Sequence, residues 1–424
     1  IQRMSKEPLD VVVIGGGITG AGIARDASMR GLAVALVEKE DFASGTSSKS
    51  ARLVHGGLRY LEQFQFGLIR SASKERHRLR RLAPRLVHPV AFTFPVYRSS
   101  KNSLLIIRIG MEIYEFIAPS RKVKRHKIVD ARQTAELEPA LAQDGLVGAA
   151  YYHYDCLTDD ARLTLATIQS AHGYGALIAN HAEVYGLRKE GGQVTGVEVL
   201  DKSTGEKFAV RARVTVNATG VWADQIRHMD DPGAGEMIRV NRGSHLVLPR
   251  ERLQIRGAVA FSSADGRRAM YGVPWGHTCI VGTTDLDHPG DLDQVYASTE
   301  EVDCMLDAVN HAFPGAGLAW GDIISTFAGL RPLTGRGELS AYQASRDHQI
   351  VESDAGLVTI SGGKLTTYRR MAEDLVDLVS KKLEDEFGVM IRASRKTDRV
   401  PLTEGAFEVD SVVKGLTERY PRLE

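Results

Sequence analysis

Residues 9–40 constrain the fold of this 424-residue chain more than any other segment. They read as an apolar run, a glycine-rich turn, a small-residue helix and a second apolar run that ends at Glu38. Gly15, Gly17 and Gly20 form the pattern G-x-G-x-x-G between the first apolar run and the helix. Because the pattern follows a strand, opens a helix and has an acid about 20 residues further on, it predicts a dinucleotide-binding unit.

The chemistry of such a unit explains these residue types. Glycines let backbone N–H groups at a helix N-terminus reach a pyrophosphate. A carboxylate at the end of the second strand, here Glu38, accepts hydrogen bonds from a ribose hydroxyl. NAD and FAD both use this unit, so the rest of the chain must separate the two cofactors.

Composition excludes several classes of protein. The formal net charge of +1 gives no global field for nucleic acid. Three cysteines, Cys156, Cys279 and Cys304, have neither disulfide nor zinc spacing, so we expect a reducing, cytosolic compartment and no metal site. The N-terminal residues lack the apolar region of a signal peptide. No run of 18 apolar residues exists, so we expect no membrane-spanning helix.

Residues 68–127 read as helical and basic, and residues 104–117 within them are strongly apolar. An apolar helix flanked by cations is typical of an interfacial helix on anionic lipid. A buried helix with a solvated basic end fits the same pattern, and the residues leave both interpretations open.

The middle and the end of the chain favour FAD over NAD. Residues 181–220 alternate apolar and polar side chains and predict a β-meander that returns to a buried strand. Further strands are predicted at 244–249, 269–274 and 279–285, and residues 357–383 predict another strand, glycine turn and helix. A simple NAD enzyme would continue with βα repeats, whereas a long antiparallel section resembles flavoproteins of the glutathione-reductase type.

Eight segments resemble the FAD-dependent glycerol-3-phosphate dehydrogenases, in family order from residue 9 to about residue 385. These segments are VVVIGGGITGAGIARDASMRG, TSSKSARLVHGGLRYLE, YDCLTDDARL, VNATGVWAD, RGSHLVLP, VGTTD, GLRPL and SGGKLTTYR. The combination of HGGLRY, GLRPL and GGKLTTYR carries the resemblance, since any one of them alone is unspecific.

The resemblance implies an α/β (α+β) fold: a glutathione-reductase-type FAD-binding Rossmann domain, an inserted antiparallel-sheet substrate domain and the start of a C-terminal helical domain. We expect a discontinuous FAD-binding domain, a substrate-binding domain in two pieces, and the helical domain last. Their predicted bounds are 1–70, 146–230 and 320–390; 71–145 and 231–319; and 391–424.

The implied reaction oxidises sn-glycerol 3-phosphate to dihydroxyacetone phosphate by hydride transfer from C2 to flavin N5. A phosphate dianion calls for fixed cations, and the family match assigns this role to Arg59 and Arg331. The C2 hydroxyl proton calls for a base with a pKa near the working pH, so we expect His55 to act, with His245 as the alternative.

Lys364 carries a cation that can stabilise an anionic reduced flavin and hold a substrate oxygen. Tyr60 either donates its phenol to the substrate or packs in the core. Arg52 and the hydroxyls of the run 46–48 suit cofactor phosphates, although that run also fits a solvated loop. The residues expected to bind FAD are Gly15, Gly17, Gly20, Glu38, Thr46, Ser47, Ser48, Arg52, Val184, Ala218, Gly220, Gly363, Leu365 and Thr366.

Partners and location follow from the same resemblance. We expect electrons to pass to a membrane quinone and the protein to associate peripherally with the anionic inner face of the cell membrane, from the cytoplasm. A homodimer is also compatible with the sequence. Three alternatives stay open: a glycerophosphate oxidase that uses O2, an amine or amino-acid oxidase on the same fold, and a flavin-bearing interaction protein without enzyme activity.

Overall fold

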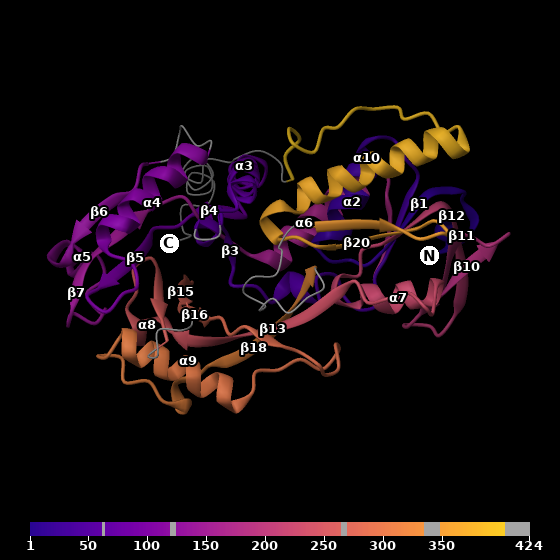
Figure 1. Ribbon diagram of the computed structural model, residues 1–424. Helices are drawn as coiled ribbons and strands as arrows, with labels where there is room; N and C mark the ends of the chain where they lie inside the picture. Colours follow the sequence, from indigo (N-terminus) through magenta and orange to yellow (C-terminus); the bar gives the residue numbers. More distant parts are fainter. Residues whose placement is uncertain (62–63, 119–123, 264–268, 335–347, 403–424) are drawn as a thin grey trace, which may run out of the picture.

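The computed structural model describes residues 1–61, 64–118, 124–263, 269–334 and 348–402, and only the backbone of residues 59 and 60. Two large sheets organise these residues, and Figure 1 shows them side by side. The architecture is mixed α/β, as the sequence predicts. In the described residues, none of the helices combines the length and the apolar character needed to cross a bilayer.

The first sheet has eight strands around β1, and its core strands are parallel. The path runs β10-β11-β12-β1-β2-β9, with β20 against β12 and β19 against β20. The strands are β1 (Leu9–Ile14), β2 (Val34–Val37), β9 (Leu177–Ala179), β10 (Ala182–Glu190), β11 (Gln193–Asp201), β12 (Lys207–Asn217), β19 (His348–Glu352) and β20 (Leu357–Gly362). β10, β11 and β12 form the predicted antiparallel meander.

Helices cover this sheet on both faces. Alternate residues of β1 explain the two cores: Val11 and Val13 pack toward one face and Val12 and Ile14 toward the other. Figure 1 shows α10 over β12 and β20, with α7 on the opposite side. The helices are α1 (Gln2–Lys6), α2 (Ile18–Met29), α6 (Asp160–Gly173), α7 (Ala223–Asp230) and α10 (Tyr368–Phe387).

The second sheet has nine strands and is mostly antiparallel. The path runs β17-β13-β16-β15-β14-β5-β7-β6, and β18 pairs with β13. The strands are β5 (Phe92–Tyr97), β6 (Lys127–Asp130), β7 (Leu146–Tyr152), β13 (Ile238–Pro249), β14 (Ala258–Ser262), β15 (Ala269–Trp275), β16 (Thr278–Gly282), β17 (Leu286–Asp287) and β18 (Ser325–Thr334).

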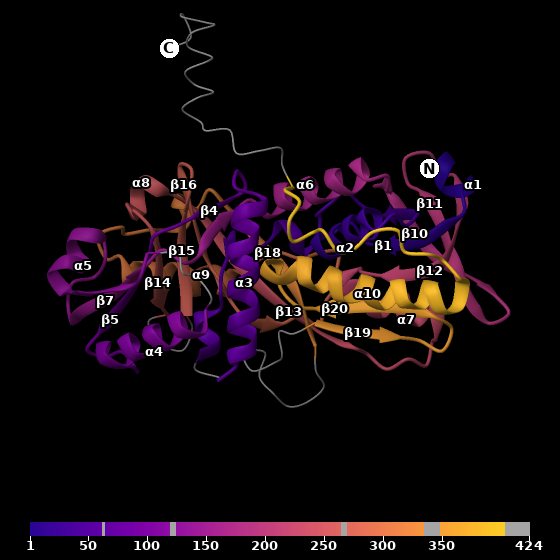
Figure 2. The same cartoon turned by 90° about the horizontal axis from the view of Figure 1, so that it is seen from above.

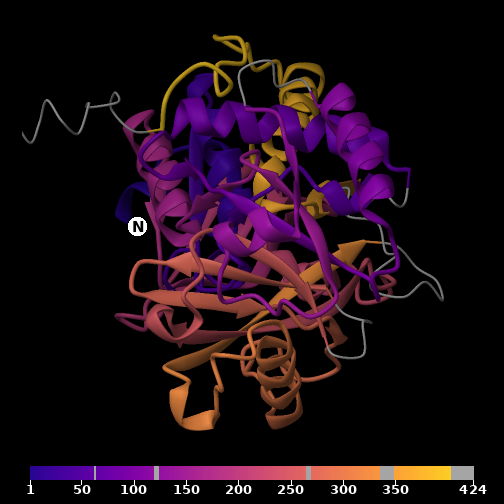
Figure 3. The same ribbon diagram turned by 90° about the vertical axis from the view of Figure 1, so that its left-hand side faces the viewer.

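Helix α9 packs beneath the second sheet, where Figure 3 shows it in orange below the salmon strands. Figure 2 shows α3 between the two halves of the molecule. The helices of this half are α3 (Phe66–Leu82), α4 (Leu104–Ile117), α5 (Ala131–Leu137), α8 (Arg250–Leu253) and α9 (Thr299–Ala312). A small sheet contains β3 (Leu53–Val54), β8 (Cys156–Thr158) and β4 (Val87–Pro89).

Two expectations about local structure need correction. Residues 68–127 are not helical throughout, because Pro84 follows the end of α3 and β5 then pairs with β7 and β14. Helix α4 is not buried: Leu105, Ile109 and Phe116 are 64%, 51% and 93% exposed. The interpretation of α4 as a buried helix was therefore wrong.

The predicted domain bounds stay a prediction, and strand pairing adds two facts to them. β7 and β18 belong to the nine-stranded sheet, although the predicted bounds place both in the FAD-binding domain. Residues 391–402 form an irregular segment with a turn and no helix, and Leu402 donates its N–H to the Leu82 carbonyl at 2.8 Å. The rest of the expected C-terminal helical domain, 403–424, lies outside the described residues.

Candidate active site

The glycine turn after β1 brings three chain segments together. Gly15 has φ of 110°, and a Cβ there would lie 2.7 Å from the Ala218 carbonyl oxygen. A Cβ on Gly20 would lie 2.0 Å from the Gly15 oxygen, so both positions require glycine. A Cβ on Gly17 would lie 3.2 Å from Ser47 Oγ. The missing side chains leave the backbone of this turn close to the β12 turn and to the 46–48 segment.

Polar groups line this turn. Glu38 accepts the Gly16 N–H at 2.6 Å and the Glu40 N–H at 2.9 Å. Ser47 Oγ accepts the Ile18 N–H at 2.9 Å, which places a hydroxyl at the N-terminus of α2. A carboxylate and a hydroxyl fixed at a helix N-terminus suit the ribose and diphosphate of a dinucleotide. The residues present therefore fit FAD.

The other predicted hydroxyls and Arg52 have partners within the protein. Thr46, in the 3₁₀ turn η1 (Thr46–Ser48), donates to the Leu330 carbonyl at 2.6 Å. Ser48 Oγ lies 3.4 Å from the Gly45 oxygen. Arg52 forms an ion pair with Asp160 at the start of α6. These contacts tie the 46–52 segment to β18 and α6, so it is not a free solvated loop; its role toward cofactor phosphates stays a prediction.

Most of the remaining residues predicted to bind the cofactor lie in two glycine turns that follow strands of the first sheet. Ala218 donates its N–H to the Ile14 oxygen at 2.9 Å, and Gly220 begins η3 (Gly220–Trp222) with φ of 62°. Gly363 has φ of 74° and precedes η5 (Leu365–Thr367), which contains Leu365 and Thr366. Val184 differs from these: its side chain is buried in the core beneath β1, so only its backbone can face a ligand.

The HGGLRY segment meets the second of these turns. His55 follows β3, and its carbonyl accepts a hydrogen bond from Thr366 Oγ1 at 3.3 Å. This contact joins the loop of His55 to the turn of Lys364, which precedes Thr366 by two residues. Arg59 and Tyr60 lie on the 3₁₀ turn η2 (Leu58–Leu61), and their side chains are outside the described part of the structure.

His245 lies on β13 in a dry environment. Its side chain is 2% exposed and stacks on Phe327 with ring centroids 4.6 Å apart. Burial, followed by the nearby charges of Arg331 and Arg52, lowers the pKa of His245 to about 3. Neither ring nitrogen has a hydrogen-bond partner in the described structure. His245 is therefore neutral near pH 7.

Arg331 lies on β18 beside this histidine, and its guanidinium is held in place. Nη1 donates to Asn241 Oδ1 at 2.7 Å and Nη2 to Thr283 Oγ1 at 2.9 Å. Asp285 Oδ1 lies 3.7 Å from Nη1. A Cβ on Gly243 would lie 2.0 Å from Nη2, so glycine at this position makes room for the cation.

Glu301 supports the strand from behind. It accepts hydrogen bonds from Ser244 Oγ at 2.8 Å and from Thr284 Oγ1 at 2.6 Å, and it pairs with Arg242. Burial would raise the pKa of Glu301, but hydrogen bonds from the Ser298 N–H and these hydroxyls lower it overall. Sequence reasoning missed Asn241, Thr283 and Glu301; the VGTTD segment was a signal for Thr283 alone.

β18 connects the parts of the site, because it contacts η1, η3 and β20 as well as β13. His245 and Arg331 thus lie on one strand pair, while His55 and Lys364 lie on two loops that touch each other. The fold and this arrangement define a flavin-dependent oxidoreductase with a cation beside a buried histidine.

Comparison with known proteins agrees with this class. Residues 10–369 match the family model described as FAD dependent oxidoreductase. Aerobic glycerol-3-phosphate dehydrogenases of Staphylococcus haemolyticus and Bacillus subtilis are 38% and 39% identical, each over 95% of this chain and 72% of the relative. The glycerol-3-phosphate dehydrogenase of Bacillus halodurans, solved with FAD, is 34% identical with a TM-score of 0.80, covering 99% of this chain and 72% of that one. The chain belongs to the glycerol-3-phosphate dehydrogenase family of FAD-dependent oxidoreductases.

Proposed function

We propose that this protein oxidises sn-glycerol 3-phosphate to dihydroxyacetone phosphate with FAD and passes the electrons to a membrane quinone. The observation that carries the proposal is Arg331, a cation fixed by Asn241 and Thr283 beside a buried histidine. Such a preset fork suits two oxygens of a phosphate dianion. The relatives that are 38% and 39% identical support the same substrate.

Each residue of the proposed site has a separate role in the reaction. Arg331 binds the phosphate, with Arg59 as its proposed second cation. His55 accepts the C2 hydroxyl proton on its imidazole, and Lys364 holds a substrate oxygen. His245 serves poorly as a base because its pKa is about 3, which supports His55 in that role. Bound FAD supplies the hydride acceptor for the hydrogen that leaves C2.

Anaerobic mixing of the FAD-loaded protein with glycerol 3-phosphate tests this proposal. Absorbance at about 450 nm should bleach, since reduction removes the oxidised flavin band. Glycerol, which lacks the phosphate, should bleach it far more slowly. Bleaching by an amino acid or an amine, and not by glycerol 3-phosphate, would refute the proposal in favour of an amine oxidase. No bleaching by any of these compounds would favour the non-enzymatic alternative.

A cleft near the two catalytic loops supports quinone as the acceptor. The cleft has a volume of about 590 Å³ and contains Phe64, Phe66, His348 and Asp374. Phe64 is 76% exposed and lies edge-to-face with Phe66, with ring centroids 6.1 Å apart. The Phe64 N–H donates to the Leu61 oxygen, and Leu61 directly follows the HGGLRY segment. Aromatic walls suit a planar ring.

A proton carrier lies in the same cleft. His348 Nε2 is 3.4 Å from Asp374 Oδ2, and Arg370 also lines the cleft. Quinone reduction takes up two electrons and two protons; bound FAD in its reduced form would supply the electrons and one proton, and His348 would relay the other proton from solvent. Phe64→Ala combined with Phe66→Ala should slow reoxidation by a soluble quinone and leave reduction by substrate unchanged.

The matched control for this experiment is Phe387→Ala, an exposed phenylalanine at the far end of α10. Reoxidation should be compared with quinone and with O2 as the acceptor. Rapid reoxidation by O2 with formation of hydrogen peroxide, and slow reoxidation by quinone, would identify an oxidase and refute the quinone assignment.

Helix α4 supports peripheral attachment to a membrane. Ile106, Ile109, Ile113 and Phe116 are exposed on one helix, while Met111 and Tyr114 face the protein. Exposed apolar stripes of this kind mark interaction surfaces. If α4 buries this stripe among lipid headgroups, no other protein surface is needed to shield the stripe from water.

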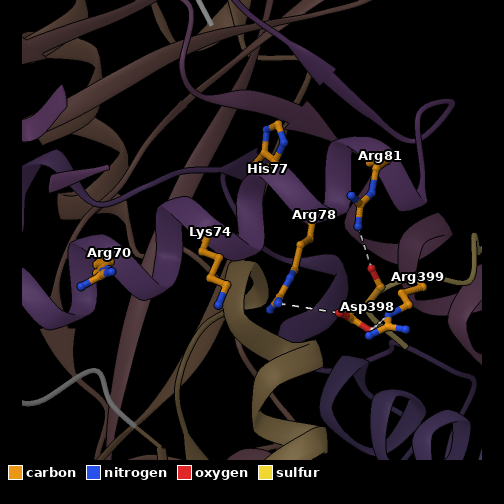
Figure 4. Close-up of a pocket in the computed structure, with 7 residues that line it drawn as sticks. All are labelled: Arg70, Lys74, His77, Arg78, Arg81, Asp398 and Arg399. Carbon is orange, nitrogen blue, oxygen red and sulfur yellow. Dashed lines mark hydrogen bonds and ion pairs between the residues drawn. The ribbon is translucent and has the colours of Figure 1, made fainter. Parts of the chain in front are cut away.

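Helix α3 packs against α4 and adds positive charge. Figure 4 shows Arg70, Lys74, Arg78 and Arg81 along one side of α3, in a cleft of about 530 Å³ that also contains Arg399. Arg78 and Arg399 pair with Asp398, so the cleft keeps a net positive charge. This charge suits anionic lipid headgroups at the cytoplasmic face of the membrane.

Sedimentation with vesicles tests the attachment. The protein should bind vesicles that contain phosphatidylglycerol more tightly than vesicles of phosphatidylcholine alone. Ile109→Glu with Phe116→Glu should abolish binding, and Lys74→Glu should weaken binding to the anionic vesicles only. Met390→Glu, at another exposed apolar residue, is the control. Unchanged binding by the α4 variant would refute this part of the proposal.

A further inference from the structure

The loop that carries His55 rests on a buried carboxylate. β3 pairs with β8, so Asp155, which directly precedes β8, lies beside the residues that follow β3. The Gly56 N–H donates to Asp155 Oδ1 at 3.0 Å, and Asp155 is 7% exposed. The backbone next to His55 is therefore hydrogen-bonded to a carboxylate from a distant part of the chain.

Buried Arg76 holds that carboxylate directly, and Tyr114 in turn holds Arg76. Arg76 Nη1, on α3, donates to the same Asp155 oxygen at 2.8 Å and to the Tyr114 hydroxyl, on α4, at 3.0 Å. Arg76 and Tyr114 are each 2% exposed. Burial would lower the pKa of Arg76, but Tyr114 and Asp155 outweigh burial and raise it, so the guanidinium stays charged. Arg76 consequently does not belong to the outer basic side of α3.

The contact leaves no free space on the loop. A Cβ on Gly56 would lie 1.9 Å from the Tyr114 hydroxyl oxygen and 2.6 Å from Arg76 Nη1. On the other side, Thr366 Oγ1 donates to the His55 carbonyl at 3.3 Å. Polar groups thus hold the peptide between His55 and Gly56 from two directions. They fix the backbone position from which the His55 imidazole extends.

Stability alone is a weak reason for this arrangement. A buried ion pair often contributes no more than apolar residues of the same volume, because both charges lose their hydration. Here the pair instead presents one fixed oxygen to one backbone N–H of the active-site loop. An arrangement of this kind determines the position of the loop backbone. A displacement of about 1 Å near the reacting atoms can lower the reaction rate about 100-fold.

We infer that Asp155, held by Arg76, which Tyr114 supports, is a positioning residue that sets the place of the His55 loop. The inference rests on the proposed function, in which His55 is the base. Asp155 itself touches no substrate; it acts through the Gly56 N–H.

The decisive variants are Asp155→Ala and Asp155→Asn in the FAD-loaded protein. Alanine removes the acceptor for the Gly56 N–H, and kcat should fall about 10- to 100-fold. KM for glycerol 3-phosphate should rise by less than kcat falls, because Arg331 on the nine-stranded sheet keeps its hold on the phosphate even if η2, which contains Arg59, shifts with the loop. Asparagine keeps an acceptor oxygen and should restore part of kcat.

Amide hydrogen exchange provides a readout that does not depend on activity. Exchange in the peptide that contains residues 55–57 should accelerate at least about tenfold in Asp155→Ala, since the Gly56 N–H loses its buried acceptor. Tyr114→Phe, which removes only one hydroxyl, should change kcat and exchange in the same direction by less, and it guards against loss of folding in the first variant. Asp26→Asn, which breaks the buried pair with Arg30 on α2, is the matched control and should leave both unchanged.

His55→Asn separates the inference from the proposed function. If His55→Asn leaves kcat unchanged, the base assignment in the proposed function is wrong. If His55→Asn lowers kcat but Asp155→Ala lowers neither kcat nor the protection of residues 55–57, the positioning inference is overturned. A kcat loss in Asp155→Ala that matches a similar loss in Asp26→Asn would also overturn it, because the effect would then be general destabilisation.

Discussion

Replacing Gly243 by alanine should raise KM for glycerol 3-phosphate without unfolding the protein. Gly243 lies in the extended strand β13, so alanine causes no backbone strain there. Its Cβ would lie 2.0 Å from Arg331 Nη2 and 2.5 Å from Arg331 Cζ. Because these atoms form the end of a flexible side chain, the guanidinium should move and the strand should stay.

The size of the effect follows from that geometry. Ordinary contact needs about 3.5 Å, so the guanidinium must shift by more than about 1 Å. Its hydrogen bonds to Asn241 at 2.7 Å and to Thr283 at 2.9 Å cannot both survive such a shift. A charge-assisted hydrogen bond contributes about 1.5–3 kcal/mol, so the loss of one phosphate contact should raise KM by about 10- to 150-fold.

Steady-state kinetics with glycerol 3-phosphate and a soluble quinone measure this effect, and flavin absorbance reports whether FAD is retained. Gly272→Ala on β15 of the same sheet is the control, since the nearest atoms to its Cβ lie 3.5 Å away. A Gly243→Ala variant with unchanged KM would refute the assignment of Arg331 to the phosphate.

Three further predictions test other parts of the molecule. His55→Asn should keep FAD but slow flavin reduction by about two to four orders of magnitude, measured by stopped-flow absorbance; a rate near wild type would contradict the base assignment. The pKa of His245 is lowered from 6.5 to about 3, so its contribution to stability is full above pH 6.5 and declines as the pH falls toward 3; thermal melts should show a weaker loss in His245→Gln, and parallel curves would contradict this. Glu75→Ala removes two of the hydrogen bonds of buried Arg369, at 2.7 and 2.9 Å, and leaves it paired with Glu373, so it should lower the free energy of unfolding by about 3 kcal/mol in denaturant titrations; Glu7→Ala, in an exposed pair, should not change the melting temperature.

Local patterns were enough to predict the elements that bind the cofactor. The strand, glycine turn and helix at residues 9–29 follow from apolar runs and from glycines that no other residue can replace. The meander at 182–217 and the returning strand at 357–362 follow from alternation and turn residues. The same patterns failed at 92–97, where β5 forms because distant strands pair with it.

Charge alone was a poor guide to the site. Arg76 lies within residues 68–127, which the sequence shows only as a basic segment, but the fold buries it against Asp155 and Tyr114. It offered Arg52 as a phosphate cation, whereas the fold pairs it with Asp160. Neither pairing has a local signal in the sequence, since Asp155 lies 79 residues after Arg76 and Asp160 lies 108 residues after Arg52.

The sequence by itself determined the class of cofactor and the chemistry of the candidate residues, because backbone freedom at glycine and the charge of arginine or histidine are properties of single residues. Only the tertiary structure decided that His245 is buried away from water and that Asn241 and Thr283 fix the orientation of the Arg331 guanidinium. The tertiary structure also decided that Asp155 supports the His55 loop. Burial and hydrogen-bond partners depend on strands and helices far apart in the chain, and they set which charges stay available for a ligand.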